Sequence, residues 1–80
     1  MKKEQFLLVC DKFKLDEINR GWFRHYVEYE CQGLIATEDE GGDWNIHRVE
    51  DNNFYLFNRL TKKKAEEIIN FIRETEVLFI

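Results

Sequence analysis

The sequence predicts an α+β domain in which an antiparallel sheet of four to five strands, arranged as a meander, is packed by one C-terminal amphipathic helix. Three observations predict it. Runs of strand length follow one another through residues 5–60, turn residues separate these runs, and an apolar stripe of helical period follows residue 61. No helix-length pattern lies between the runs, so parallel crossover connections are not expected.

The composition predicts a single domain over residues 1–80. The chain has 80 residues, a formal net charge of −4 and no proline. A chain of this length buries only about 60% of its unfolded surface, so its core is small. The hydrophobic content of 44% is nevertheless too high for a disordered chain. Aromatic residues make up 15% of the chain and enlarge the core, because each one buries roughly 150–250 Å².

The first part of the chain predicts a long hairpin. Residues 5–10 form an apolar run of strand length, and residues 13–15 continue it by alternating apolar and charged side chains. Residues 15–20 could instead form one helical turn. Gly21 predicts a turn, and residues 22–31 (WFRHYVEYEC) predict the second strand. Alternation places Phe23, His25, Val27, Tyr29 and Cys31 on its inner face, and Trp22, Arg24, Tyr26, Glu28 and Glu30 on its outer face.

The middle of the chain predicts three further strands. These are residues 34–37, residues 44–49 and residues 54–60, and the last run is apolar on both faces, which favours a well-covered position. The acidic segment between the first two, with its paired glycines, is the clearest loop in the chain. Residues 50–53 predict a second turn.

Residues 61–75 predict the helix, with Thr61 as its N-cap. The apolar stripe has the spacing i, i+3, i+4 and i+7 and consists of Ala65, Ile68, Ile69 and Ile72. The tail VLFI, residues 77–80, is too apolar to remain in water. We expect it to pair on a sheet edge, to pack beside the helix, or to meet another chain.

The sequence shows no targeting signal and no membrane span. The apolar run near its start extends only over Phe6–Cys10, whereas a signal peptide needs about 7–15 apolar residues and a membrane span about 20. We therefore expect a cytoplasmic protein without membrane contact. Cys10 and Cys31 both lie in apolar runs, which indicates reduced, buried thiols; they would pair only if their strands were neighbours.

The sequence predicts neither a metal site nor a cofactor. Structural zinc sites use close pairs of ligands, but Cys10, His25, Cys31 and His47 are widely and irregularly spaced. The chain has no serine for a catalytic triad, and Gly41-Gly42 lies between acids that would repel phosphate. We therefore expect that the protein is not an enzyme. A small metal-independent ribonuclease that uses His25 and His47 is the third hypothesis.

Single-stranded nucleic-acid binding is the second hypothesis. Trp22, Arg24 and Tyr26 share one strand face and could stack on bases and contact phosphate. However, the net charge is −4, and Glu28 and Glu30 lie on the same face. Because positive potential drives backbone binding, direct contact with nucleic acid is not favoured.

Protein binding is the leading hypothesis. An acidic loop beside an exposed aromatic side chain suits docking on a basic surface, because charge steers the encounter and the aromatic side chain anchors it. The expected partner-binding residues are Glu38, Asp39, Glu40, Asp43 and Trp44, joined by Trp22, Tyr26, Glu28 and Glu30. Self-association into a homodimer through the VLFI tail or an exposed strand edge is also expected.

In general character, and in the segment EDEGGDW (Glu38 to Trp44), the chain resembles small cytosolic accessory proteins of bacteriophages and mobile elements. Many such proteins inhibit host defence systems of the CRISPR or restriction type. The resemblance implies a non-enzymatic inhibitor that docks on a basic, nucleic-acid-handling host protein. It transfers no functional residue to this chain.

Overall fold

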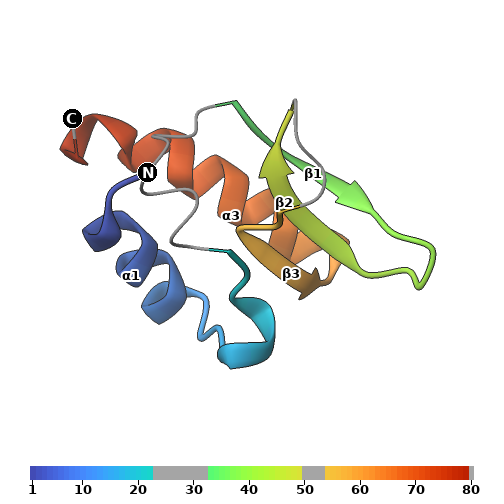
Figure 1. Ribbon diagram of the computed structural model, residues 1–80. Helices are drawn as coiled ribbons and strands as arrows, with labels where there is room; N and C mark the ends of the chain where they lie inside the picture. The colour runs from blue at the N-terminus through green and yellow to red at the C-terminus, as the bar shows by residue number, and fades with distance from the viewer. Residues whose placement is uncertain (23–32, 50–53, 80) are drawn as a thin grey trace.

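The computed structural model describes residues 1–22, 33–49 and 54–79, which form the predicted α+β architecture (Figure 1). The three strands make one antiparallel sheet in the order β1-β2-β3. The predicted four to five strands are not confirmed, because the described residues contain three. The elements in chain order are α1 (Lys3–Lys12), the 3₁₀ helix η1 (Glu17–Asn19), β1 (Leu34–Glu38), β2 (Trp44–Arg48), β3 (Phe57–Leu60), α3 (Lys62–Thr75) and the 3₁₀ helix η2 (Glu76–Phe79).

Residues 5–10 are helical, so the predicted first strand is wrong. They belong to α1, in which Leu7 and Leu8 are exposed. The buried side chains recur at helical spacing and are Gln5, Phe6, Val9 and Cys10. A short apolar run fits both a strand and a helix, and contacts with distant elements decide between them. Here Phe6 stacks on Phe57 of β3 with 5.3 Å between the ring centroids.

A residue with left-handed backbone follows the end of α1. Lys14 has a φ of +53°, and the next N–H group, that of Leu15, donates to the Cys10 carbonyl at 2.9 Å. The strand predicted at residues 13–15 is therefore wrong. The alternative, a helical turn within residues 15–20, is confirmed as η1, which the Asp16 carboxylate caps by accepting a backbone hydrogen bond.

β1 and β2 form the predicted hairpin. Their register runs from Leu34 opposite Arg48 to Glu38 opposite Trp44, so the predicted strands and the acidic loop between them are confirmed. Because opposite residues share a face, side chains alternate between the helix-facing side, which includes Ile46, and the other side of the sheet.

β3 completes the sheet and is shorter than predicted. It begins at Phe57, so the strand covers only the second half of the predicted run at residues 54–60. The register with β2 shifts between Trp44 and Ile46, which marks a bulge. Arg59 lies in this irregular stretch with a φ of +55°, and its N–H group donates to a side chain of β2.

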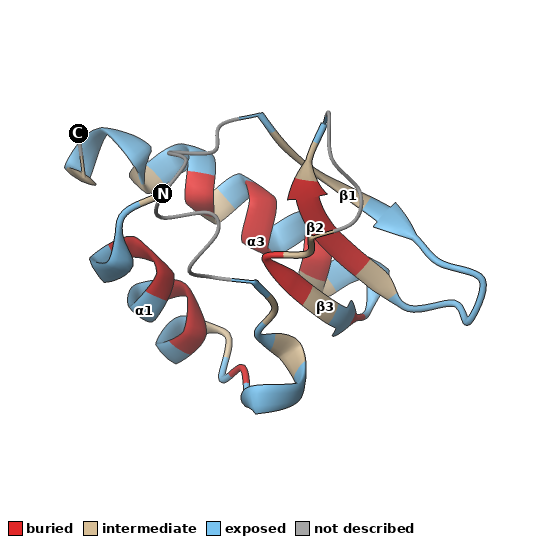
Figure 2. Cartoon of the chain, in the orientation of Figure 1, coloured by how far each residue is buried: buried red, intermediate tan, exposed pale blue. Residues whose placement is uncertain are grey.

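The core lies between the sheet and the two long helices (Figure 2). Ile46, Phe57 and Leu60 of the sheet are buried, and α3 covers their side of it. The predicted helix is confirmed, including Thr61 as its N-cap. The Thr61 hydroxyl accepts a hydrogen bond from the backbone N–H group of Lys64. The predicted stripe is also confirmed, since its four residues are all buried: Ala65, Ile68, Ile69 and Ile72.

A buried glutamine fixes α1 to the end of α3. Gln5 is only 4% exposed, and its Nε2 group donates to the Ile72 carbonyl at 3.0 Å and to the Thr75 hydroxyl at 3.0 Å. After α3, η2 contacts α1, and Figure 1 shows η2 near the N-terminus. Val77 and Leu78 remain 71% and 72% exposed, so this part of the VLFI tail does not become core.

The chain after η1 runs beside β3. The backbone of Arg20 forms an isolated antiparallel β-bridge with Phe57, and the Gly21 N–H group donates to the Leu56 carbonyl at 2.9 Å. A Cβ atom at Gly21 would lie 1.8 Å from the Tyr55 carbonyl oxygen, so this close approach requires glycine.

Candidate protein-binding surface

The loop between β1 and β2 projects away from the two long helices (Figure 1). It carries four acidic residues, which we call the acidic tip: Glu38, Asp39, Glu40 and Asp43. All four residues are exposed, as are the two glycines between them. The structure therefore confirms that the predicted acidic residues gather on one protruding hairpin end.

Asp39 holds the acidic tip in shape. Its Oδ1 atom accepts hydrogen bonds from the backbone N–H groups of Gly41 and Asp43, at 2.9 and 3.1 Å. Its Oδ2 atom accepts from the Asn45 side-chain amide at 3.1 Å. Two backbone bonds close the loop, from Asp39 N–H to the Asp43 carbonyl and from Gly42 N–H to the Asp39 carbonyl. Asp39 therefore organises the loop rather than offering a free carboxylate.

The same bonds lower the pKa of the Asp39 carboxyl below its ordinary value. The Asn45 amide is the largest cause, and the backbone N–H groups of Asp43, Gly41 and Gly42 add to it. Each of these donors favours the ionised form. The ionised Asp39 carboxylate therefore stabilises the loop through hydrogen bonds within the protein, without a cation from a partner.

Asn45 connects the acidic tip to the rest of the sheet. It is 2% exposed, and its Oδ1 atom accepts a hydrogen bond from the Arg59 N–H group at 3.2 Å. The side chain thus links the Asp39 carboxylate on one side to the bulge of β3 on the other. Because the amide nitrogen and the amide oxygen of Asn45 both form hydrogen bonds, this residue of β2 connects the loop to β3.

The other three carboxylates of the acidic tip point to solvent. Glu38, Glu40 and Asp43 are exposed, and their carboxylates make no ion pair or hydrogen bond with any residue that the structure describes. These three groups are available to a partner.

Trp44 lies at the base of the acidic tip and is half-buried rather than exposed. It packs against the core, lies opposite Glu38 on β1, and pairs with Leu60 of β3. The Lys62 Nζ atom lies 5.7 Å from the centre of its ring, in cation–π range. Trp44 therefore offers a partner less surface than the fully exposed side chain that the sequence predicts.

Trp22 is exposed but lies away from the acidic tip. Its side chain is 59% exposed and meets the Phe54 ring edge to face, with centroids 5.3 Å apart. Its N–H group donates to the Tyr55 carbonyl, at the end of the sheet opposite Trp44. The structure therefore does not bring the two tryptophans into one surface. The other predicted residues of this strand lie outside the described residues: Arg24, His25, Tyr26, Glu28, Glu30 and Cys31.

The His47 side chain, on β2, is buried and only 3% exposed. Its Nδ1 atom lies 2.8 Å from the Arg48 carbonyl, which can only accept, so Nδ1 carries a proton. Its Nε2 atom lies 2.9 Å from the Thr37 hydroxyl, and its ring leans on Tyr55 at 5.8 Å. Both ring nitrogens are thus occupied by internal hydrogen bonds, as expected of a histidine that fills space.

Cys10 is a buried free thiol in the described part of the chain, as predicted. Burial raises its pKa, and the positive charge of Arg20 opposes this effect. Among residues 1–22, 33–49 and 54–79, no three cysteine, histidine, aspartate or glutamate side chains converge as metal ligands. None of the helices described is both long enough and apolar enough to cross a bilayer.

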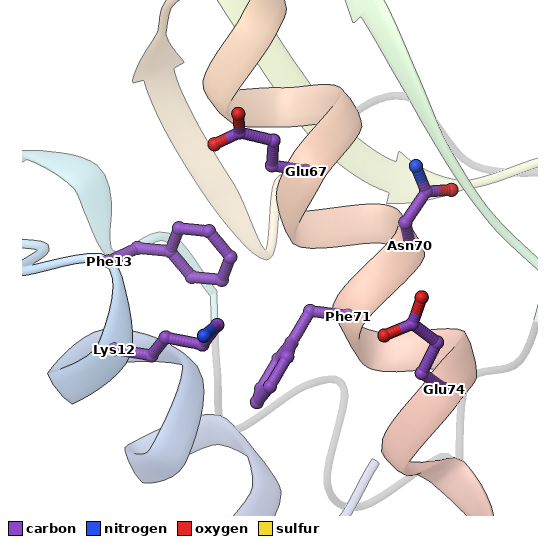
Figure 3. A pocket seen from close by; sticks show the side chains of 6 residues that line it. All are labelled: Lys12, Phe13, Glu67, Asn70, Phe71 and Glu74. Atoms are coloured by element: carbon purple, nitrogen blue, oxygen red, sulfur yellow. The ribbon is translucent and has the colours of Figure 1, made fainter.

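An open groove of about 510 Å³ lies between the end of α1 and the middle of α3, and Figure 3 shows its lining. Sequence patterns do not indicate this groove, because they predict a strand at residues 13–15. The available signal is Phe71, an aromatic residue that lies beside the apolar stripe of α3 and widens it. The lining residues are Lys12, Phe13, Glu67, Asn70, Phe71 and Glu74.

Comparison of the chain with protein-family models, with curated proteins and with solved structures gives no match.

Proposed function

We propose that this protein is a non-enzymatic binding protein that docks its acidic tip on a basic surface of a nucleic-acid-handling host protein and inhibits it. The single observation that supports this proposal is that the four carboxylates of the acidic tip have two different roles. Asp39 is bonded inside the loop, whereas the carboxylates of Glu38, Glu40 and Asp43 are exposed and have no partner among the described residues. The carboxylates are therefore presented by a loop that is already ordered.

Order before binding matters because flexible loops lose conformational entropy when they dock. The hydrogen bonds of Asp39 and Asn45 fix the backbone of the loop in the free protein. Trp44 and Lys62 lie at its base and would border the contact. Long-range charge attraction would speed the encounter, and added salt would slow it, because the Debye length at 0.1 M salt is only about 10 Å.

The proposal is tested by capture of the partner from a bacterial host with a charge-reversed tip. The test variant is the triple substitution Glu38→Lys, Glu40→Lys and Asp43→Lys, which leaves Asp39 in place. The matched control makes the same charge change at exposed residues elsewhere, namely Glu4→Lys, Glu17→Lys and Glu66→Lys.

We expect the tip variant to lose the partner that the wild-type protein captures, and the control to retain it with reduced salt sensitivity. Undiminished capture by the tip variant would show that the surface is wrong. Equal loss in both variants would mean that only net charge matters.

Single-stranded nucleic-acid binding stays as the second candidate because Trp22 is 59% exposed and is held edge-on by Phe54. Such a ring is free to stack on a base. Fluorescence anisotropy with labelled oligonucleotides at low salt tests this candidate. Salt-sensitive binding that Trp22→Ala abolishes would support it, and its absence would remove it.

A further inference from the structure

The groove between α1 and α3 already holds a positive charge over its aromatic rings. The Lys12 Nζ atom lies 5.1 Å from the centre of the Phe71 ring and 5.9 Å from that of Phe13. The two rings meet edge to face with centroids 5.7 Å apart, so they form one aromatic surface. Lys12 makes no ion pair with a carboxylate in the described part of the chain. This site thus accommodates a cation through ring faces alone.

The opposite wall of the groove is acidic. Glu67, Asn70 and Glu74 recur on α3 at spacings of three and four residues and belong to the lining of the groove (Figure 3). Both glutamates are exposed, and their carboxylates make no hydrogen bond or ion pair within residues 1–22, 33–49 and 54–79. The lining contains two carboxylates and a single ammonium group, so the groove has a formal excess of one negative charge.

We propose that this groove binds an arginine side chain of a partner protein, whose guanidinium group replaces the Lys12 ammonium over the Phe13 and Phe71 rings and pairs with Glu67 or Glu74. The inference rests on the proposed function only in taking the partner to be a basic protein. It concerns a different surface from the acidic tip, so the two can fail separately.

Arginine fits this groove better than lysine does. A guanidinium group is planar, stacks on aromatic faces and donates up to five hydrogen bonds in a fixed fork. The lining of the groove contains the rings of Phe13 and Phe71, and α3 adds two carboxylates and the side-chain amide of Asn70. A lysine ammonium group would gain only the cation–π contacts that Lys12 already makes. An anion would meet two carboxylates and is not expected to bind.

Lys12 is exposed and is easily displaced. A cation–π contact at an exposed site corresponds to a factor of about two to five in affinity. Removal of Lys12 should therefore strengthen, not weaken, the binding of an arginine. A gain in arginine affinity would show that Lys12 competes with the ligand for the rings, whereas a loss would show that Lys12 contacts the ligand.

The experiment is an NMR titration of the ¹⁵N-labelled protein with the capped peptide Gly-Gly-Arg-Gly-Gly, and with its lysine counterpart. We expect the arginine peptide to shift the amide signals of Phe13 and Phe71, and the lysine peptide to bind more weakly. Lys12→Ala should tighten arginine binding by about two- to fivefold, whereas Lys3→Ala, an exposed charge-matched control on α1, should leave it nearly unchanged.

The acidic wall is tested in the same titration. Glu67→Gln combined with Glu74→Gln should weaken arginine binding by about fivefold or more, while Glu66→Gln, on the adjacent side of α3, should not. Absence of shifts at Phe13 and Phe71 would overturn the inference, as would weaker binding in Lys12→Ala. Loss of partner capture on charge reversal of the acidic tip, with an unresponsive groove, would retain the proposed function and reject only this inference.

Discussion

Gln5 provides a sharp test of how α1 is attached, because one side-chain amide makes both hydrogen bonds to α3. The perturbation is Gln5→Glu, which preserves shape and removes the donor. An ionised carboxylate can only accept, and it would face the Ile72 carbonyl oxygen at the position where Nε2 now donates. Thr75 could still turn its hydroxyl toward the new group, but that hydroxyl now donates to the Phe71 carbonyl at 2.8 Å.

The magnitude follows from the burial and the two bonds of Gln5. Loss of two hydrogen bonds of 3.0 Å costs about 1 kcal/mol each, and a buried, unpaired charge raises the total to about 3 kcal/mol or more. For a domain of this size each kcal/mol lowers Tm by roughly 4–8 °C, so Tm should fall by about 12–24 °C at pH 7. Gln5→Met, which removes the donor without adding a charge, should cost less.

The assay is thermal and urea unfolding followed by circular dichroism, at pH 7 and at pH 4, with each variant compared with the wild type at the same pH. Protonation restores an O–H donor, so the deficit of Gln5→Glu should shrink as the pH falls toward about 4. Glu4→Gln, at an exposed neighbour, should change stability by less than about 0.5 kcal/mol. Equal stability of Gln5→Glu and the wild type at pH 7, or a deficit independent of pH, would refute this description of α1.

Three further outcomes are expected. Gly21→Ala should destabilise the protein by about 2 kcal/mol or more in urea unfolding, since the new Cβ would overlap the Tyr55 carbonyl oxygen; wild-type stability would contradict the close approach. Lys14→Gly should stabilise it by about 0.5–1 kcal/mol, because the left-handed φ suits glycine; a loss of stability would show that the Lys14 side chain matters more than its backbone. Because the folded pKa of Asp39 is lowered, its contribution is present above the unfolded pKa and is lost as the pH falls through the folded value. In an NMR titration the amide signal of Gly41 should therefore shift below pH 3.8, and a midpoint at or above that ordinary value would count against the hydrogen-bonded loop.

The elements that could be predicted from sequence are those specified by neighbouring residues. The cap of Thr61 and the stripe that ends at Ile72 lie within α3, so their pattern survives in the folded protein. The hairpin likewise depends on Gly41-Gly42 and on the flanking strands, which are close in sequence. Local signals of this kind need no knowledge of distant contacts.

α1 could not be predicted in this way because its partners are remote. Its apolar run fits a strand by length, and the choice of helix depends on Phe57 and on the Ile72 carbonyl, the latter 67 residues away from Gln5. Tertiary contacts of this range override a short local pattern. The groove was missed for the same reason, since its Phe13 wall exists only once α1 is a helix beside α3.

The acidic tip was predicted as a set of residues but not as a mechanism. Composition identifies its charges, yet it treats Asp39 as equal to Glu40 and Asp43. The difference arises from the loop geometry, which turns two backbone N–H groups toward one carboxylate and places Asn45 within 3.1 Å of it. No pattern of residue types distinguishes the structural acid from the exposed ones.

The distance in sequence between α1 and its partners also bears on how the chain acquires its structure during synthesis. α1 is made well before β3 and α3, the elements that cover its buried face. A helix of ten residues is marginal on its own in water, so α1 has little reason to persist until Ile72 has been added. During that interval Phe6 and Val9 are open to chaperones and to other unfinished chains. Nascent chains arrested before residue 57 should therefore remain unfolded, and folding should begin only when the C-terminal half of the chain is complete.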